Sequence, residues 1–75
     1  MQQNYTVTGP IAQPRNIVAW EAEMAAVKYG RKYFASALSK GEVPNETIEV
    51  RVEDEKQVAQ TFRVRCRIEV QAEPL

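Results

Sequence analysis

The sequence holds 75 residues, with ten basic and ten acidic side chains, no histidine and a single cysteine. A chain this short has a marginal hydrophobic core, so we expect residues 1–75 to form one small domain. One cysteine excludes an internal disulfide, and the absence of histidine excludes Ser–His–Asp and Cys–His nucleophiles. Zero net charge gives no general attraction to nucleic acid or to an anionic membrane.

The first predicted element in chain order is a short strand over 5–8, which is β-branched and aromatic and ends at Gly9. A helix is predicted from about Arg15 to Ser39, and Gly41 is placed to take its left-handed cap. The helix prediction rests on apolar residues at steps of three and four: Ile17, Trp20, Met24, Val27, Phe34 and Leu38. We expect this stripe to enter the core.

The second half of the chain is predicted to be two consecutive strands. The first is Thr47–Glu53, and the second begins between Val58 and Thr61 and continues to Val70. Strict alternation puts their apolar residues on one face: Ile48, Val50, Val52, Phe62, Val64, Cys66, Ile68 and Val70. A short polar connection between them favours an antiparallel hairpin.

These elements predict an α+β fold of order β-α-β-β: a three-stranded, mainly antiparallel sheet with one amphipathic helix packed on one face. The order, the size and the long final strand resemble the layout of dodecins, small flavin-storing homo-oligomers. The resemblance implies that such a layout is stable as an assembly. Dodecins stack flavin on a tryptophan of the strand after the helix, whereas TIEVRVE has no aromatic residue. We therefore expect no cofactor.

An arginine stripe, formed by Arg63, Arg65 and Arg67, is predicted on the outer face of the last strand. Pairing with Glu49 and Glu53 of the neighbouring strand is the favoured interpretation, with Glu49 opposite Arg63 or Arg65. The alternatives are a nucleic-acid surface and a site for an acidic protein. Exposed aromatic residues, which stack bases in single-strand-binding sheets, are absent from this face of the predicted sheet.

A second helix flank is rich in small residues and includes Ala26, Tyr29, Gly30 and Tyr33. Small residues let another element approach closely, and tyrosines are common at interfaces, so we expect this flank to bind a second subunit. The alternative is a solvated side on which Gly30 kinks the helix. Arg31 interrupts the main stripe, and we expect it to pair with a glutamate of the sheet or of a neighbouring subunit.

The expected function is a small, non-enzymatic homo-oligomeric binding or adaptor module in the cytoplasm, forming a dimer or larger assembly. Oligomerisation is the remaining way to stabilise a small core that has no disulfide and no metal. Its expected partners are other copies of itself, with another protein as a further candidate, and no membrane or metal site is expected. The alternative function is a nucleic-acid-binding module that uses Arg63, Arg65 and Arg67 together with Lys28 and Lys32 of the helix.

Overall fold

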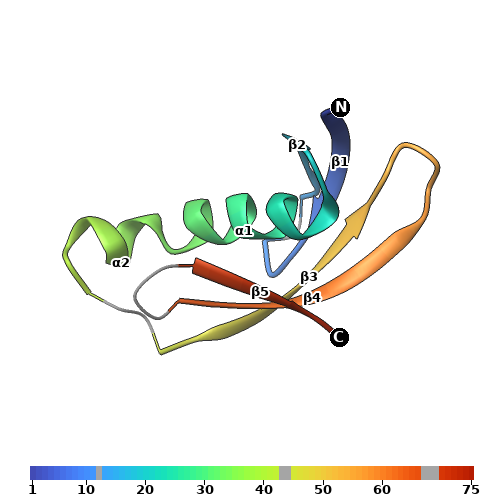
Figure 1. Ribbon diagram of the computed structural model, residues 1–75. Coiled ribbons are helices and arrows are strands. Elements are labelled where there is room, and N and C mark those ends of the chain that lie inside the picture. The colour runs from blue at the N-terminus through green and yellow to red at the C-terminus, as the bar shows by residue number, and fades with distance from the viewer. Residues whose placement is uncertain (12, 43–44, 67–69) are drawn as a thin grey trace.

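The computed structural model describes residues 1–11, 13–42, 45–66 and 70–75. One antiparallel sheet of five strands carries a helix on one of its faces (Figure 1). The elements are β1 (Gln3–Thr8), β2 (Arg15–Ala19), α1 (Ala22–Tyr33), α2 (Ala35–Ser39), β3 (Thr47–Glu53), β4 (Ala59–Cys66) and β5 (Val70–Pro74). The predicted α+β class is confirmed, but the sheet has two more strands than the three predicted.

The strands lie in the order β2-β1-β3-β4-β5. The N-terminal hairpin β1–β2 forms one side of the sheet, and the consecutive strands β3, β4 and β5 form the other. β1 and β3 join the two halves through residues 6–8 and 51–53. The layout is therefore β-β-α-β-β-β, which removes the resemblance to the β-α-β-β order of dodecins. β2 and β5 are the two free edges.

The strand β2 replaces the predicted first turn of the helix. Ile17 and Ala19 are buried and alternate with the exposed Asn16 and Val18, which is the pattern of a strand rather than a helix. Trp20, expected in the core, is 57% exposed between this strand and α1. The steps of three from Ile17 to Trp20 imitate a helical stripe, but pairing with β1 decides the structure of this segment.

The face of α1 that packs on the sheet differs from the predicted face. Ala25, Ala26, Tyr29 and Gly30 are buried, whereas Met24 and Leu38 are 38% and 37% exposed. Small side chains allow α1 to lie close to the sheet, and this close contact outweighs the burial of the longer apolar stripe. The prediction that Trp20, Met24 and Leu38 belong to the core is thus wrong, whereas Ile17 and Phe34 of the same stripe are buried as predicted and Val27 is half-buried beside the core.

α1 lies close to the sheet at Gly30. A Cβ built on it would lie 2.5 Å from Cγ1 of Val64 and 2.8 Å from Cγ1 of Val70. The helix continues through Gly30 without a break and ends at Tyr33, and Phe34 separates it from the short helix α2. Another element does pack closely on Gly30, as predicted, but that element is the sheet of the same chain.

The final stretch of the chain forms two antiparallel strands where one was predicted. β4 ends at Cys66, and Val70 begins β5, which turns back so that Val70 lies opposite Cys66. The predicted inward residues of β3 and β4 are otherwise confirmed, since Ile48, Val50, Val52, Phe62, Val64 and Cys66 are all buried. The predictions for Arg67 and Ile68 lie outside the described residues.

The two predicted turns agree with the structure. Gly41 has a φ of 73°, the left-handed conformation expected of a residue that ends a helix. β3 and β4 form the predicted hairpin, and the Asp54 carboxylate accepts hydrogen bonds from the backbone N–H groups of Lys56 and Val58 in its turn. None of the helices in the described ranges is long and apolar enough to cross a membrane.

Candidate functional site

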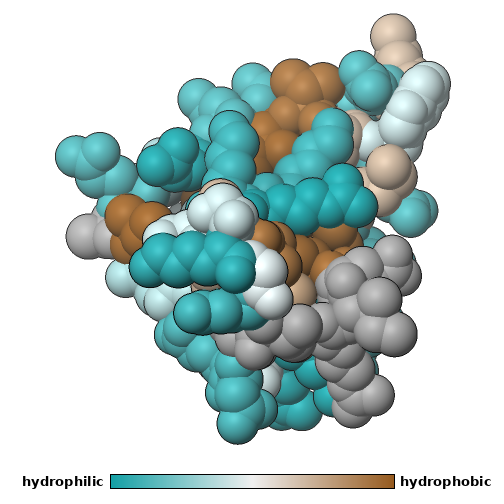
Figure 2. Space-filling model, turned by 90° about the vertical axis from the view of Figure 1, so that its left-hand side faces the viewer, coloured by the Kyte–Doolittle hydropathy of each residue, from teal (hydrophilic) through white to brown (hydrophobic). Residues whose placement is uncertain are grey.

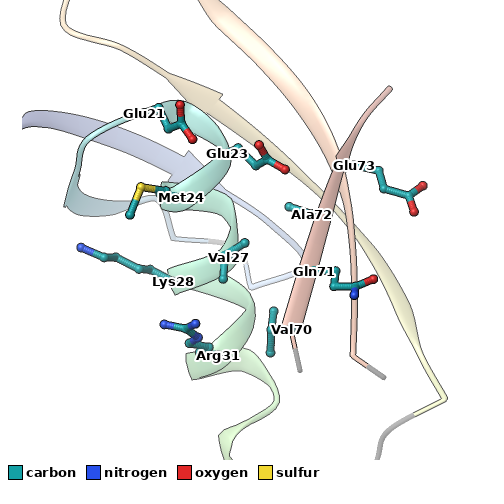
Figure 3. Close-up of a pocket in the computed structure, with 10 residues that line it drawn as sticks. All are labelled: Glu21, Glu23, Met24, Val27, Lys28, Arg31, Val70, Gln71, Ala72 and Glu73. Atoms are coloured by element: carbon teal, nitrogen blue, oxygen red, sulfur yellow. The ribbon is translucent and has the colours of Figure 1, made fainter. Parts of the chain in front are cut away.

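A groove runs between α1 and the free edge of β5, with a volume of about 400 Å³ (Figure 3). We call it the β5 groove. It is lined by Glu21, by residues of α1 and by residues of β5: Glu23, Met24, Val27, Lys28 and Arg31, and Val70, Gln71, Ala72 and Glu73. Val27 points toward β5, and Glu23 and Arg31 lie near opposite ends of the helical wall. The groove thus combines an apolar middle with an acidic end and a basic end.

The edge of β5 that borders this groove pairs with no other strand among the residues that the structure describes. The N–H of Leu75 donates to the Thr61 carbonyl of β4, at 3.0 Å. Neighbouring residues of a strand direct their backbone groups to opposite sides, so Leu75, Glu73 and Gln71 direct theirs toward β4. Val70 and Ala72, which alternate with them, direct theirs away from β4. Pro74 shares this outward position but has no N–H to donate. β5 therefore offers a short pairing edge that ends at Pro74.

A second groove, of about 390 Å³, lies where α1 passes the free edge of β2. We call it the β2 groove. It is lined by Asn16, Ile17 and Val18 of β2 and by Lys28, Arg31 and Lys32 of α1. In contrast to the β5 groove, its described lining contains three cations and no carboxylate. The two grooves therefore differ in the charge of the partner that each could accept.

Apolar surface at the α2 end of the molecule is divided into small areas. In Figure 2, which faces this end, brown apolar side chains stand apart from one another among hydrophilic ones. Leu38 of α2 is one of the exposed apolar residues of the chain. Scattered exposed apolar residues are ordinary on a protein surface, so the edge grooves are the stronger candidates for a binding site.

The residues predicted to form a subunit interface lie within the fold of one chain. Ala26, Tyr29 and Gly30 are buried against the sheet, and Tyr29 is only 2% exposed. Tyr33 is half-buried, packs edge-to-face on Phe34 and donates its hydroxyl to the Glu46 carboxylate at 2.9 Å. Because Ala26, Tyr29 and Gly30 are buried, they offer no surface to another subunit. A candidate subunit interface therefore has to use other residues.

The Tyr33–Glu46 hydrogen bond also affects the ionisation of the tyrosine. Donation to a carboxylate favours the protonated phenol, and ionisation would place two negative charges side by side. The pKa of Tyr33 is consequently raised above its ordinary value of 10.0. This contact links the end of α1 to the segment before β3, and its role is structural.

One arginine of the stripe, Arg65, forms an ion pair in the described residues, but its partner is neither Glu49 nor Glu53, which the favoured interpretation named. Glu49 lies directly opposite Arg63 in the β3–β4 register, one of the two predicted alternatives. Arg65 forms its ion pair with Glu73 of β5, and Glu53 pairs with Arg51 of its own strand at 3.1 Å. β5 therefore supplies an acidic partner that a three-stranded sheet could not provide.

The cations proposed for nucleic-acid binding do not form one surface. Arg63 and Arg65 alternate with buried residues beneath α1, so they lie on the sheet face away from the helix. Lys28 and Lys32 belong to α1, on the opposite side of the sheet, and Lys28 Nζ donates to the Val18 carbonyl at 2.7 Å. One nucleic-acid strand could not contact both groups along a straight path.

The described residues contain no group of three or more His, Cys, Asp or Glu side chains placed to hold a metal ion. Cys66 is buried under α1, as expected from its inward position on β4. Neither observation identifies a reaction, and the two edge grooves remain the features with a shape and charge suited to binding.

Sequence reasoning missed the β5 groove because it did not separate β5 from β4. One signal was present: Glu23 and Arg31 lie four residues before and after Val27, a spacing that puts all three on one side of a helix. No protein-family model, no curated protein and no solved structure matches this chain. Its function must accordingly be inferred from these surfaces.

Proposed function

We propose that this chain is a small, non-enzymatic binding module that works as a homo-oligomer, built from a dimer formed through the edge of β5. The observation that carries this proposal is the unpaired β5 edge beside the β5 groove. A free edge with an apolar border is a ready template for another strand. A second copy is the occupant that best fits, because the charges along the groove are complementary to themselves.

The backbone of β5 suits antiparallel pairing with a second β5 around a two-fold axis at Gln71. In that register Ala72 lies opposite Val70 of the second copy, and both residues direct their N–H and C=O groups outward. Each such pair exchanges two hydrogen bonds, so the two pairs would give about four. Pro74 falls just outside this register, and its missing N–H ends the pairing there.

The helical wall of the groove follows the same symmetry. A two-fold axis perpendicular to the sheet keeps both helices on one face and makes them antiparallel. With Val27 nearest the axis, Glu23 of one copy faces Arg31 of the other, and the reverse pair forms as well. An interface of this isologous kind requires a self-complementary surface, which an acid and a base at equal spacing from an apolar centre provide. This arrangement also gives Arg31 the neighbouring-subunit glutamate that its place in the sequence suggests.

Charge reversal with restoration tests the proposal. Light scattering on a sizing column should give twice the 8.5 kDa monomer mass for the natural chain. Glu23→Arg or Arg31→Glu alone should raise the dissociation constant of the dimer by about tenfold or more, because like charges then meet twice across the axis. The double variant, Glu23→Arg with Arg31→Glu, should restore the dimer because the opposite charges are exchanged.

Ala72→Pro provides an independent check on the strand pairing. It removes an N–H that makes no bond to β4, so it should weaken the dimer while leaving the far-UV circular dichroism spectrum unchanged. A monomer mass at hundreds of micromolar natural chain, or a dimer unaffected by Ala72→Pro and by both charge reversals, would overturn the proposal. Absorbance of nucleic acid across the peak would instead favour the alternative function.

A further inference from the structure

We propose that the β2 groove binds an extended acidic peptide segment of another protein. This site lies at the opposite edge of the sheet from β5, although Lys28 and Arg31 of α1 line both grooves. Lys28, Arg31 and Lys32 form one wall, and β2 forms the other. The chain as a whole has no net charge, so three cations without a lining carboxylate make a local positive potential.

The three cations have no carboxylate partner within the described part of the chain. Ion pairs there join Arg51 to Glu53 and Arg65 to Glu73, on the far side of the sheet. Lys28 donates to a backbone carbonyl, and the structure gives no bond that holds Arg31 or Lys32. The charge of Lys32 is thus available to a ligand, that of Lys28 becomes available once the carbonyl is released, and Arg31 is shared with the proposed dimer; carboxylates are the side chains that complement these cations.

The backbone of β2 gives the site a second kind of contact. The N–H of Asn4 donates to the Glu55 carboxylate, so Asn4 faces away from β2. Val18, which lies opposite Asn4, therefore directs its backbone groups to the free edge, and Asn16 does the same by alternation. The contact from Lys28 Nζ to the Val18 carbonyl agrees with this direction, since the lysine reaches that carbonyl from the groove.

A peptide added along this edge would replace the Lys28–Val18 hydrogen bond with a backbone hydrogen bond and an ion pair. The incoming strand's N–H would replace Lys28 at the Val18 carbonyl, and the released ammonium group would be free to pair with a carboxylate of the peptide. Strand addition supplies backbone hydrogen bonds, and the charged wall supplies the preference for acidic residues. Lysine at this position keeps the edge covered until an acidic segment arrives, which is also a known protection against unspecific pairing.

A peptide fits these features better than a nucleic acid. Among the described residues, the groove lining includes no aromatic side chain on which a base could stack. A phosphate backbone also has no N–H donors for the outward carbonyls of β2, whereas a polypeptide has donors and acceptors in the right alternation. The backbone edge is therefore the feature that selects the peptide.

The test uses a fluorescently labelled peptide of eight residues, alternating glutamate and valine and blocked at both ends. Fluorescence anisotropy at low ionic strength should show saturable binding to the full chain, and a peptide with glutamine in place of glutamate should bind at least tenfold more weakly. Lys32→Glu should weaken binding of the acidic peptide by about fivefold or more. Lys56→Glu, the same change in the β3–β4 turn, is the matched control and should leave the affinity unchanged.

Backbone contacts are checked by amide NMR on the ¹⁵N-labelled chain. Addition of the acidic peptide should shift the Val18 and Asn16 amide signals and slow the hydrogen exchange of both. Equal affinity of the Lys32→Glu and Lys56→Glu variants, or no binding at millimolar peptide, would overturn the proposal. So would tighter binding of an oligothymidine of equal charge at the same residues. Repeating the titration on Ala72→Pro separates the two sites, because binding at β2 should survive the loss of the dimer.

Discussion

Replacement of Gly30 by alanine should destabilise this fold, although alanine is the better helix former. In a helix interior, the change from glycine to alanine is favourable by about 1 kcal/mol. Here the new methyl group would lie 2.5 Å from Val64 Cγ1 and 2.8 Å from Val70 Cγ1. Overpacking a core costs about 1–3 kcal/mol, and a valine fully buried on a strand cannot turn its branched side chain aside. We expect the clash to win, with a net loss of up to about 2 kcal/mol.

Urea unfolding followed by far-UV circular dichroism measures this loss. Val64→Ala provides the matched background, since it removes the Cγ1 atom that the new methyl group would meet most closely. In that background Gly30→Ala should cost less, because only the 2.8 Å contact with Val70 Cγ1 remains, so the double-mutant cycle should show a favourable coupling of about 1 kcal/mol. A midpoint for Gly30→Ala at or above that of the natural chain would refute the argument. It would mean that α1 can rise from the sheet at no cost.

Three further predictions concern single side chains. Tyr29→Phe should raise the free energy of unfolding by about 1 kcal/mol, because the Tyr29 hydroxyl is buried with no hydrogen-bond partner in the residues that the structure describes; a lower urea midpoint would contradict this. Asp54→Ala should cost about 1 kcal/mol by removing the acceptor of two turn N–H groups, whereas Asp54→Asn keeps an acceptor oxygen and should cost less; equal losses would count against the turn as the cause. The raised pKa of Tyr33 means that the Tyr33–Glu46 contact stabilises fully below pH 10 and that this contribution falls as the pH rises through the folded-state pKa. In a 295 nm absorbance titration, corrected with Tyr33→Phe, the pKa should move back toward 10.0 in Glu46→Gln, and an unchanged curve would exclude Glu46 as the cause.

The strands of the second half were predictable because their alternation is strict. Thr47–Glu53 has the predicted bounds, and Phe62, Val64 and Cys66 lie inward as expected. A turn of uncertain length left two registers open, and Glu49 opposite Arg63 is one of them. Local polar and apolar alternation carries this information because each strand has one face on the core and one in solvent.

The orientation of α1 was not predictable from the same kind of pattern. Met24 and Ala26 are both apolar, and hydrophobicity alone favours burial of the larger one. What decides the orientation is the distance between helix and sheet, which Gly30 and the alanines allow to be short. That distance depends on contacts with β4 and β5, which are far away in the sequence. Residues 15–19 form a strand because of a similar non-local contact, their pairing with β1. The two grooves could not be predicted either, because they depend on which strands form the edges of the sheet.

The narrow joint between β1 and β3 has a consequence for the order of folding. Only residues 6–8 and 51–53 pair across it, whereas β3 and β4 pair over 47–53 and 59–65. Each half of the sheet closes through short connections, but the joint closes a loop of more than 40 residues, which is about the costliest closure in the chain. The N-terminal hairpin and the C-terminal three strands should therefore be separate cooperative units. The joint should be the place where the native protein first opens, with amide exchange there faster than in the interior of β3 and β4.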